Sequence, residues 1–204
     1  MMLMGKWVIF VLLFCMATLP GALYAQSPMG SGGKNSYAVL KMGGYIPEAG
    51  DMDQLGAKNG FTGQAGFGYY LYPNFALEAA VGYFESRANT GIPNTSRKFS
   101  VYPLEVAGKL GIPLGFVEPY FMMGLGGYYV RATAGNQEET STNPGGFLGG
   151  GVNFHLSKSA FLGVEARYLV LHANAPVATP YSGSSTATMY LDGVILTGNL
   201  GFRF

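Results

Sequence analysis

Charge and cysteine are both scarce in this sequence, and each shortage excludes a class of protein. Charged residues make up 11% of the 204 residues, against about 25% in a typical soluble domain. Lysine plus arginine number 12 and aspartate plus glutamate 11, which gives a net charge of +1. Nucleic-acid binding needs a clustered basic face, and disorder needs high net charge with few apolar residues. The near-neutral, apolar composition therefore argues against both.

The one cysteine, Cys15, lies in an apolar run at 7–19 that follows Lys6. This run is shorter than the roughly 20 residues that a membrane-spanning helix needs. A positive residue, a short apolar run and a small residue at Ala25 are typical of a cleaved secretory signal. We therefore predict a signal peptide at 1–25. Its removal leaves a chain without a thiol for a disulfide, a nucleophile or a metal site.

Long hydrophobic runs are also missing. Beyond residue 25 the sequence has no continuous apolar stretch of the length that a transmembrane helix requires. Yet apolar residues make up 49% of the chain, aromatic residues 14%, and glycine contributes 32 residues. A closed β-barrel is the other structure that satisfies every backbone polar group inside a membrane. The composition thus favours a membrane barrel over a soluble domain.

After a flexible N-terminal segment at 26–35, which we expect in the periplasm, apolar and polar residues alternate in short segments. Near the C-terminus, for example, Leu196 and Leu200 share one face and Asn199 lies on the other. Each segment is long enough for the 9–11 residues of a tilted membrane strand. The expected fold is all-β, an eight-stranded antiparallel up-and-down transmembrane β-barrel at 36–204. The eight predicted strands are 36–46, 61–72, 75–86, 99–112, 119–131, 146–157, 160–171 and 189–204.

Three features indicate which face of these strands looks outward, and the first is the size of the residues opposite the apolar ones. In a soluble sandwich the apolar face forms the core, whereas in a membrane barrel it meets lipid. The face opposite the apolar residues carries many small residues, which suit a narrow lumen better than a solvated face. These small residues are Gly66, Gly68, Ala80, Gly82, Gly124, Gly126, Gly149 and Gly151. A soluble sandwich or lipocalin-like barrel is therefore the weaker alternative.

The connections alternate in length, as they do in outer-membrane barrels. Short turns are predicted at 73–74, 113–118 and 158–159, and long polar loops at 47–60, 87–98, 132–145 and 172–188. Pro103 lies inside a predicted strand and removes a backbone donor, so we expect a bulge there.

Aromatic residues gather near the predicted strand ends, like the two girdles of a membrane barrel. One predicted girdle contains Tyr72, Phe75, Phe116, Tyr120, Phe154, Phe161 and Phe204. The other contains Tyr45, Phe61, Tyr83, Phe99, Tyr102, Tyr129 and Tyr168.

Short motifs occur in several of these segments, namely Gly68-Tyr69-Tyr70 with Pro73-Asn74, Leu77-Glu78, Val81-Gly82-Tyr83, Gly163-Val164-Glu165 and Arg167-Tyr168. With these motifs the chain resembles the small outer-membrane β-barrel (porin-like) family, which includes OmpX-, OmpA- and OmpW-type barrels. The closing residues 200–204, with Leu200, Phe202 and the terminal Phe204, are similar to the signal that the barrel-assembly machinery reads. The resemblance implies the fold and an outer-membrane location, but not an activity.

Seven charged side chains are expected to point into the lumen by the same alternation. They are Lys41, Glu78, Glu105, Lys109, Glu165, Arg167 and Arg203. Isolated buried charges are costly, so we expect ion pairs that plug the barrel and fix its register. Glu78 and Lys109 fall on a cross-strand diagonal and form one expected pair. The alternative is a polar track for a small solute.

His155, Ser157 and Glu165 form the one set that looks catalytic, because outer-membrane lipid A deacylases use a similar trio. His155 and Ser157 fall at the periplasmic end of a strand, however, whereas lipid A lies in the outer leaflet. We therefore expect no enzyme activity and no cofactor.

The predicted outer loops hold two groups with binding chemistry. Asp51, Asp53 and Glu48 carry oxygen ligands that suit a divalent cation, but a solvated acidic loop is the stronger interpretation and we predict no metal site. The second group is cationic and suits lipopolysaccharide phosphates as a set of charge-assisted donors. It consists of Arg87, Arg97 and Lys98.

The sequence thus predicts a monomeric outer-membrane barrel with a structural or interaction role through its extracellular loops. The first alternative is a narrow OmpW-like channel for small, apolar solutes, and the second is a lipid A-modifying enzyme. Expected partners are outer-membrane lipid, lipopolysaccharide and the barrel-assembly machinery, and no nucleic acid.

Overall fold

The computed structural model describes residues 35–47, 59–89, 96–134, 137–177 and 185–204. The chain divides into two units, 1–30 and 31–204, and all of these residues belong to the second. The predicted signal peptide at 1–25 and the acidic residues Glu48, Asp51 and Asp53 lie outside the described residues. The described residues contain no helix long and apolar enough to cross a membrane.

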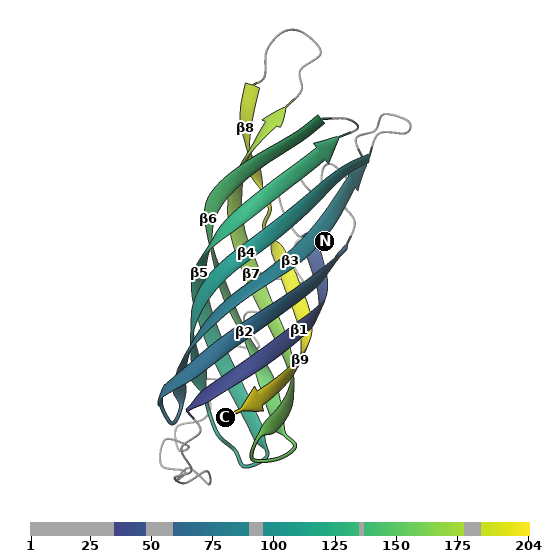
Figure 1. Ribbon diagram of the computed structural model, residues 1–204. Helices are drawn as coiled ribbons and strands as arrows, with labels where there is room; N and C mark the ends of the chain where they lie inside the picture. Colours follow the sequence, from purple (N-terminus) through teal and green to yellow (C-terminus); the bar gives the residue numbers. More distant parts are fainter. Residues whose placement is uncertain (1–34, 48–58, 90–95, 135–136, 178–184) are drawn as a thin grey trace, which may run out of the picture. The chain divides into compact units, whose positions relative to one another are not determined.

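The described chain forms one antiparallel sheet that closes on itself (Figure 1). Its strands are β1 (Ser36–Pro47), β2 (Gly60–Tyr72), β3 (Phe75–Asn89), β4 (Ser96–Gly111), β5 (Val117–Ala134), β6 (Gln137–His155), β7 (Ala160–Val177), β8 (Ser185–Tyr190) and β9 (Gly193–Arg203). The strands follow the order β6-β5-β4-β3-β2-β1-β9-β7, and pairing of β6 with β7 closes the barrel.

The last two strands together form the eighth wall segment of the barrel. Both pair with β7 in one continuous register, from Val177↔Ser185 in β8 to Ala160↔Phe202 in β9. Leu191 and Asp192 interrupt the strand but keep its hydrogen bonding, because Leu191 N–H donates to the Leu171 carbonyl and Asp192 Oδ1 accepts from Leu171 N–H. The predicted closed eight-stranded antiparallel barrel is confirmed.

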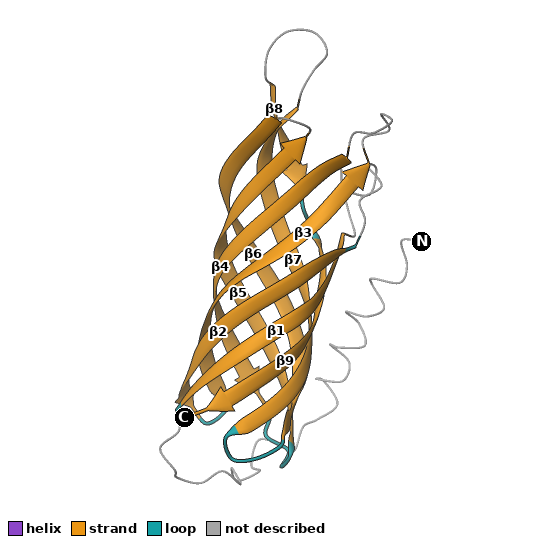
Figure 2. Cartoon of the chain, turned by 45° about the vertical axis from the view of Figure 1, so that its right-hand side comes forward, coloured by secondary structure: helices purple, strands orange, loops and turns teal. Residues whose placement is uncertain are grey.

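The two ends of the barrel differ in their connections. We call the end with the short connections after β2, β4 and β6 the turn end, which carries the teal loops in Figure 2. The opposite end, here the hairpin end, carries long β-hairpins. The prediction of a loop at 132–145 is wrong, because β5 and β6 continue there with paired strands from Arg131↔Thr140 to Ala134↔Gln137. The 172–188 loop likewise contains the paired ends of β7 and β8. Strand pairing needs only backbone N–H and C=O groups. It therefore continues past the point where the apolar alternation of the side chains ends.

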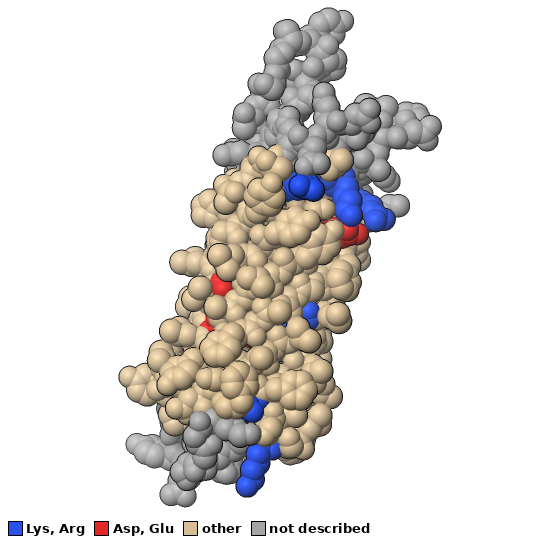
Figure 3. All heavy atoms as spheres, viewed as in Figure 1, with Lys and Arg blue, Asp and Glu red and all other residues tan. Residues whose placement is uncertain are grey.

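The two faces of the wall alternate as predicted. Leu40, Met42, Leu104, Val106 and Leu125 are exposed, whereas Lys41 and Glu105 between them on the strands are buried. The space-filling view shows a mostly uncharged outer surface on this face of the barrel (Figure 3). Apolar side chains therefore face outward and charged ones inward, the reverse of a soluble sandwich.

Large rings fill the lumen, which the sequence interpretation did not anticipate. Tyr45, Phe99, Tyr120 and Phe161, predicted as girdle members, are instead buried inside. Glycine makes the room: a Cβ at Gly68 would collide with the Tyr37 ring, and one at Gly151 with the Tyr120 ring. Other predicted girdle members are exposed, namely Tyr72, Phe116, Phe154 and Phe204 at the turn end and Phe61, Tyr102 and Tyr129 toward the hairpin end. Phe75, Tyr83 and Tyr168 are half-buried.

The bulge expected at Pro103 is absent. Pro103 pairs with Tyr128 in the regular β4–β5 register. Toward β3, pairing stops after Val81↔Leu104 and resumes at Phe84↔Val101 without a change of register. The missing N–H of proline therefore costs local pairing on one side but inserts no extra residue. The β2–β3 register shifts instead between Tyr70 and Tyr72, next to the turn.

Candidate functional site

The centre of the lumen holds a lysine shared between two carboxylates. Lys41 Nζ, from β1, lies 2.7 Å from Glu78 Oε1 on β3 and 2.8 Å from Glu165 Oε2 on β7. Tyr37 donates its hydroxyl to Glu78 Oε2 at 2.7 Å, and Tyr120 donates to Glu165 Oε2 at 2.8 Å. The lysine and both carboxylates are almost fully buried. With Tyr120 on β5, the cluster ties four strands together across the barrel.

The reach from β1 to β3 depends on the strand between them. Glu78 is paired with Gly68 of β2, and the missing side chain at Gly68 leaves the space that the Tyr37 ring occupies. Glycine on the lumen face of β2 thus lets groups from β1 contact β3 directly.

The expected Glu78–Lys109 pair is replaced by other contacts. Glu78 takes Lys41 as its partner, and Lys109 Nζ lies 3.7 Å from the centroid of the Tyr120 ring. Ala76 and Ala107 are the direct partners of Lys109 and Glu78, so the two charged residues are diagonal neighbours, as expected. Neighbouring positions on the sheet do not predict that Lys41, two strands away from Glu78, is the cation that contacts this carboxylate.

A second cluster lies closer to the hairpin end, around Glu105. Arg167 Nη1 is 2.7 Å from Glu105 Oε2. Gln64 Nε2 donates to the same oxygen at 3.1 Å, and the Tyr128 hydroxyl donates to Oε1 at 2.8 Å. The Arg167 guanidinium lies 4.8 Å from the centroid of the Phe147 ring.

A third cluster lies at the turn end and contains an acid that the sequence interpretation missed. Glu118 Oε2 is 2.9 Å from Arg203 Nη2 and 3.0 Å from His155 Nε2. Arg203 Nη2 also donates to the Tyr70 hydroxyl at 2.8 Å. The sequence pattern does not predict Glu118 as a lumen residue, because the predicted strand at 119–131 begins one residue after it. With Glu118, four lumen carboxylates face the four expected cations Lys41, Lys109, Arg167 and Arg203, so their formal charges balance.

An apolar layer fills the lumen on the hairpin side of these clusters. Tyr45, Phe84, Phe99, Leu171 and Leu191 belong to one cluster of buried side chains. The Tyr45 hydroxyl donates to the Leu191 carbonyl at 3.0 Å and so ties β1 to the interruption in the eighth wall segment. The lumen therefore carries its charged side chains from the turn end to its middle. Beyond them it is mainly apolar, although the buried side chains of Thr62, Ser86 and Asn143 also lie in that part.

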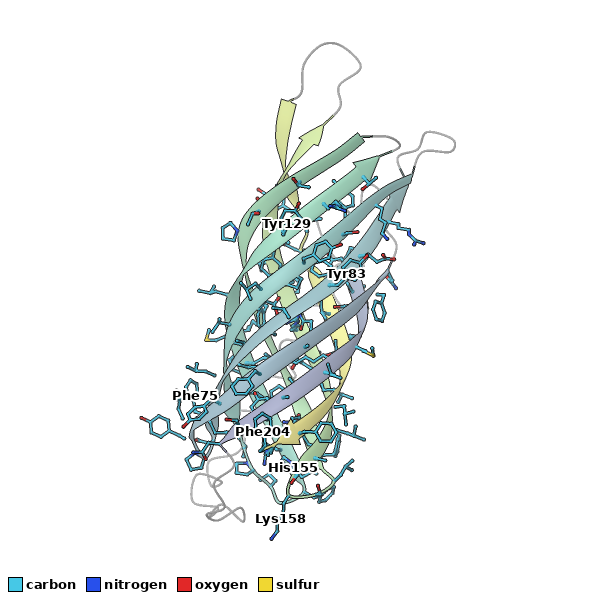
Figure 4. All side chains as sticks on the ribbon, viewed as in Figure 1. Phe75, Tyr83, Tyr129, His155, Lys158 and Phe204 are labelled. Carbon is cyan, nitrogen blue, oxygen red and sulfur yellow. The ribbon has the colours of Figure 1, made fainter. Side chains whose placement is uncertain are left out.

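The three residues that looked catalytic do not come together. His155 contacts Glu118, while the Ser157 hydroxyl oxygen accepts from the backbone N–H groups of Ser159 and Ala160 in the turn. Glu165 binds Lys41 and Tyr120. Figure 4 shows His155 and Lys158 at the turn end. The serine thus stabilises a turn, and no base is in contact with it.

A charged rim lies on the outer surface near the hairpin end, where Figure 3 shows blue spheres grouped beside a red one. Lys98 Nζ is 2.7 Å from Glu85 Oε2, and Arg87 Nη2 is 3.4 Å from Glu85 Oε1. The Arg87 side chain is 64% exposed and that of Lys98 43%. Arg97 pairs through its backbone with Ala88 and Ala134. Next to this rim, Tyr83 and Tyr129 flank Tyr102, with ring centroids 5.3 and 6.1 Å from it (Figure 4).

The residues of the predicted assembly signal face outward. Leu200, Phe202 and Phe204 are exposed on β9 and at the chain end. No cluster of three or more metal-ligating side chains occurs among the residues that the structure describes.

A closed antiparallel barrel with an apolar exterior and a charged interior defines this chain as a transmembrane β-barrel protein. A family model of the outer membrane protein β-barrel domain matches residues 8–204. The chain belongs to that family, and the protein is an integral protein of the Gram-negative outer membrane.

Solved structures of outer-membrane barrels are similar to this one. Neisserial surface protein A aligns with a TM-score of 0.58 and 17% identity, covering 86% of this chain and all of that one. OprG of Pseudomonas aeruginosa aligns with a TM-score of 0.57 and 16% identity, covering 85% of this chain and 98% of that one. Ail, the attachment invasion locus protein of Yersinia pestis, aligns with a TM-score of 0.52 and 12% identity, covering 84% of this chain and 99% of that one. At these identities the likeness concerns the fold. No curated protein matches the chain.

Proposed function

We propose that this protein is a closed, non-catalytic barrel that serves as a structural and interaction platform at the cell surface. In this proposal the turn end faces the periplasm and the hairpin end faces outward, as the lengths of the connections favour. The single observation that carries the proposal is the filled lumen, in which three charged clusters lie beneath an apolar layer. Eight-stranded barrels are just wide enough for side chains to fill them.

The charged clusters support a plug better than a solute track. A track needs charged groups that are free to exchange partners with the solute, whereas each of the four lumen carboxylates here contacts a cation inside the protein. The mainly apolar layer adds a barrier to ions on the outer side, because it offers them few polar partners. A narrow channel for small apolar solutes remains the alternative, because an apolar layer is the part of the lumen that such a solute would cross.

Planar-bilayer recording of the purified barrel separates the two functions. We expect a silent baseline from the native protein. We also expect no steady current from a variant with Glu105→Lys and Lys109→Glu, because the apolar layer stays in place. A steady native conductance whose ion selectivity changes in that variant would favour the channel and overturn the closed barrel. Uptake of an apolar solute into vesicles that contain the native protein would do the same.

We further propose that the charged rim contacts lipopolysaccharide phosphates. Arg87 and Lys98 are exposed cations beside the tyrosines Tyr83, Tyr102 and Tyr129, whose rings suit the boundary between lipid and water. Glu85 holds both cations in place but also competes with phosphate for them. During biogenesis, the exposed residues Leu200, Phe202 and Phe204 are the expected contact for the barrel-assembly machinery.

Binding of the detergent-solubilised protein to immobilised bisphosphorylated lipid A tests the rim. Replacing Arg87 and Lys98 together with glutamine is expected to weaken binding roughly tenfold or more, since hydrogen bonds to charged groups contribute about 1.5–3 kcal/mol each. Glu85→Gln is expected to strengthen binding, and Lys158→Gln, at the turn end, is the matched control. Equal binding by all four proteins would exclude this site.

A further inference from the structure

A groove interrupts the lipid-facing wall where β6, β7 and β9 run side by side. Its volume is about 480 Å³, within the roughly 300–1,000 Å³ of small-molecule sites. The outward-facing residues that line it are Gly150, Val152, Val164, Ala166, Leu196 and Gly198. Glu165 and Thr197 also line it, but their side chains are buried on the lumen side, so they contribute backbone to its floor.

Small outward residues create the groove. Gly150 pairs with Ala166 across β6 and β7, and Val164 pairs with Gly198 across β7 and β9. Packing inside the barrel does not require glycine at 198, because a Cβ there would meet only the Met42 carbonyl, at 3.9 Å. Gly151, by contrast, faces the lumen and is needed to avoid Tyr120. The hollow at Gly198 is thus a feature of the outer surface.

The surroundings of the groove decide what fills it. Val164 and Leu196 are exposed at its edges, and the neighbouring Leu162 and Leu200 continue the exposed apolar wall that meets lipid. The polar side chains beneath it are engaged elsewhere: Glu165 binds Lys41, and Thr197 donates to Asn199. Water would find no side-chain partner there, and an empty groove would lose dispersion contacts. The occupant is therefore apolar and comes from the bilayer.

The position of the groove along the strands favours one leaflet. Val152 lies two residues before Phe154, an exposed ring at the turn end, and both lie on the outward face of β6. The rings that mark the other interface are far along the same strand, where Thr142 pairs with Tyr129. The groove therefore belongs to the half of the wall nearer the turn end, where phospholipid rather than lipopolysaccharide supplies the chains.

We propose that this groove is a resident lipid site that holds one acyl chain of a phospholipid from the periplasmic leaflet. The site is independent of the closed lumen and of the charged rim, since it uses neither set of side chains. An acyl chain suits it because the groove is continuous with the lipid-facing wall and offers shape without hydrogen-bonding side chains.

Native mass spectrometry of the intact barrel tests the proposal. The protein is reconstituted in vesicles of phosphatidylethanolamine with added lipopolysaccharide and then extracted into mild detergent. We expect one retained phospholipid per native barrel. Gly198→Leu, which fills the groove, is expected to lower the retained fraction about tenfold. Gly127→Leu is the matched control: this lipid-facing glycine also has room for a side chain, because nothing lies within 4 Å of its Cβ position.

Each other outcome overturns the proposal. Equal retention by Gly198→Leu and the native protein would show that the lipid binds elsewhere. Retention of lipopolysaccharide in place of phospholipid would show that the bound lipid comes from the outer leaflet. A native dimer that Gly198→Leu dissociates would make the groove an interface between two copies. If Gly198→Leu does not fold, Ala166→Leu fills the same groove from β7 and replaces it in the comparison.

Discussion

At the scale of single residues, the lumen charges are held by hydrogen bonds as much as by ion pairing. Glu105 accepts from Arg167, Gln64 and Tyr128, which come from three other strands. A buried ion pair is not automatically stabilising, because desolvation offsets much of its attraction. Removing one partner, however, leaves the other charge buried and uncompensated. The contribution of each charged side chain to the stability of the barrel therefore depends on its partners being present.

Arg167→Met is predicted to lower the free energy of unfolding by about 3–5 kcal/mol, since it leaves the Glu105 carboxylate buried without a cation. Adding Glu105→Gln should recover much of that loss, because the neutral amide no longer needs the guanidinium. Urea unfolding in lipid vesicles, followed by the mobility shift of the folded barrel on gels, measures both. A double variant as unstable as the sum of the single variants would show that the two groups are not coupled.

At the scale of the strands, glycine on the lumen face decides which elements touch. β2 carries Gly66 and Gly68 there, so side chains of β1 reach over it to β3. On β6, Gly149 leaves room for the Arg167 stem and Gly151 for the Tyr120 ring. Small and large residues thus alternate around the barrel, which keeps it filled.

Gly68→Ala is predicted to destabilise the barrel by about 1–3 kcal/mol, because the added methyl group collides with the Tyr37 ring in a close-packed lumen. In a Tyr37→Leu background the same change should cost much less. Gly127→Ala, on the lipid face, provides the control and should be nearly neutral. The same unfolding assay applies, and an equal cost for Gly68→Ala with and without the Tyr37 ring would refute the explanation.

In the whole barrel, the first and last residues of the wall lie at the same end as the short turns. Ser36 and Phe204 exchange backbone hydrogen bonds there, and Arg203 N–H donates to the Ser159 carbonyl in the β6–β7 turn. An even number of wall segments returns the chain to the end where it began. The charged rim around Arg87 lies at the opposite end, so the molecule presents different surfaces to the two compartments.

Cysteine labelling in intact cells tests this orientation. The only native cysteine, Cys15, lies in the predicted signal peptide, so single introduced cysteines report their own positions. A membrane-impermeant maleimide should label Arg87→Cys in whole cells, but Lys158→Cys only after the outer membrane is permeabilised. The reverse pattern would invert the barrel and remove the basis of both the lipopolysaccharide and the phospholipid proposals.

The barrel can be predicted from the amino-acid sequence alone, because the period-two alternation and the apolar wall depend only on neighbours along the chain. It also placed Lys41, Glu78, Glu105, Lys109, Glu165, Arg167 and Arg203 on the inward face, where the structure has them. The alternation of side chains along a strand shows on which face a residue lies, but not which residue it contacts. Three features became visible only in the folded barrel: Lys41 bridges Glu78 and Glu165, Glu118 completes the charge balance, and rings such as Tyr120 occupy the lumen. These contacts cross a closed barrel, so their distances depend on the stagger of all its strands at once.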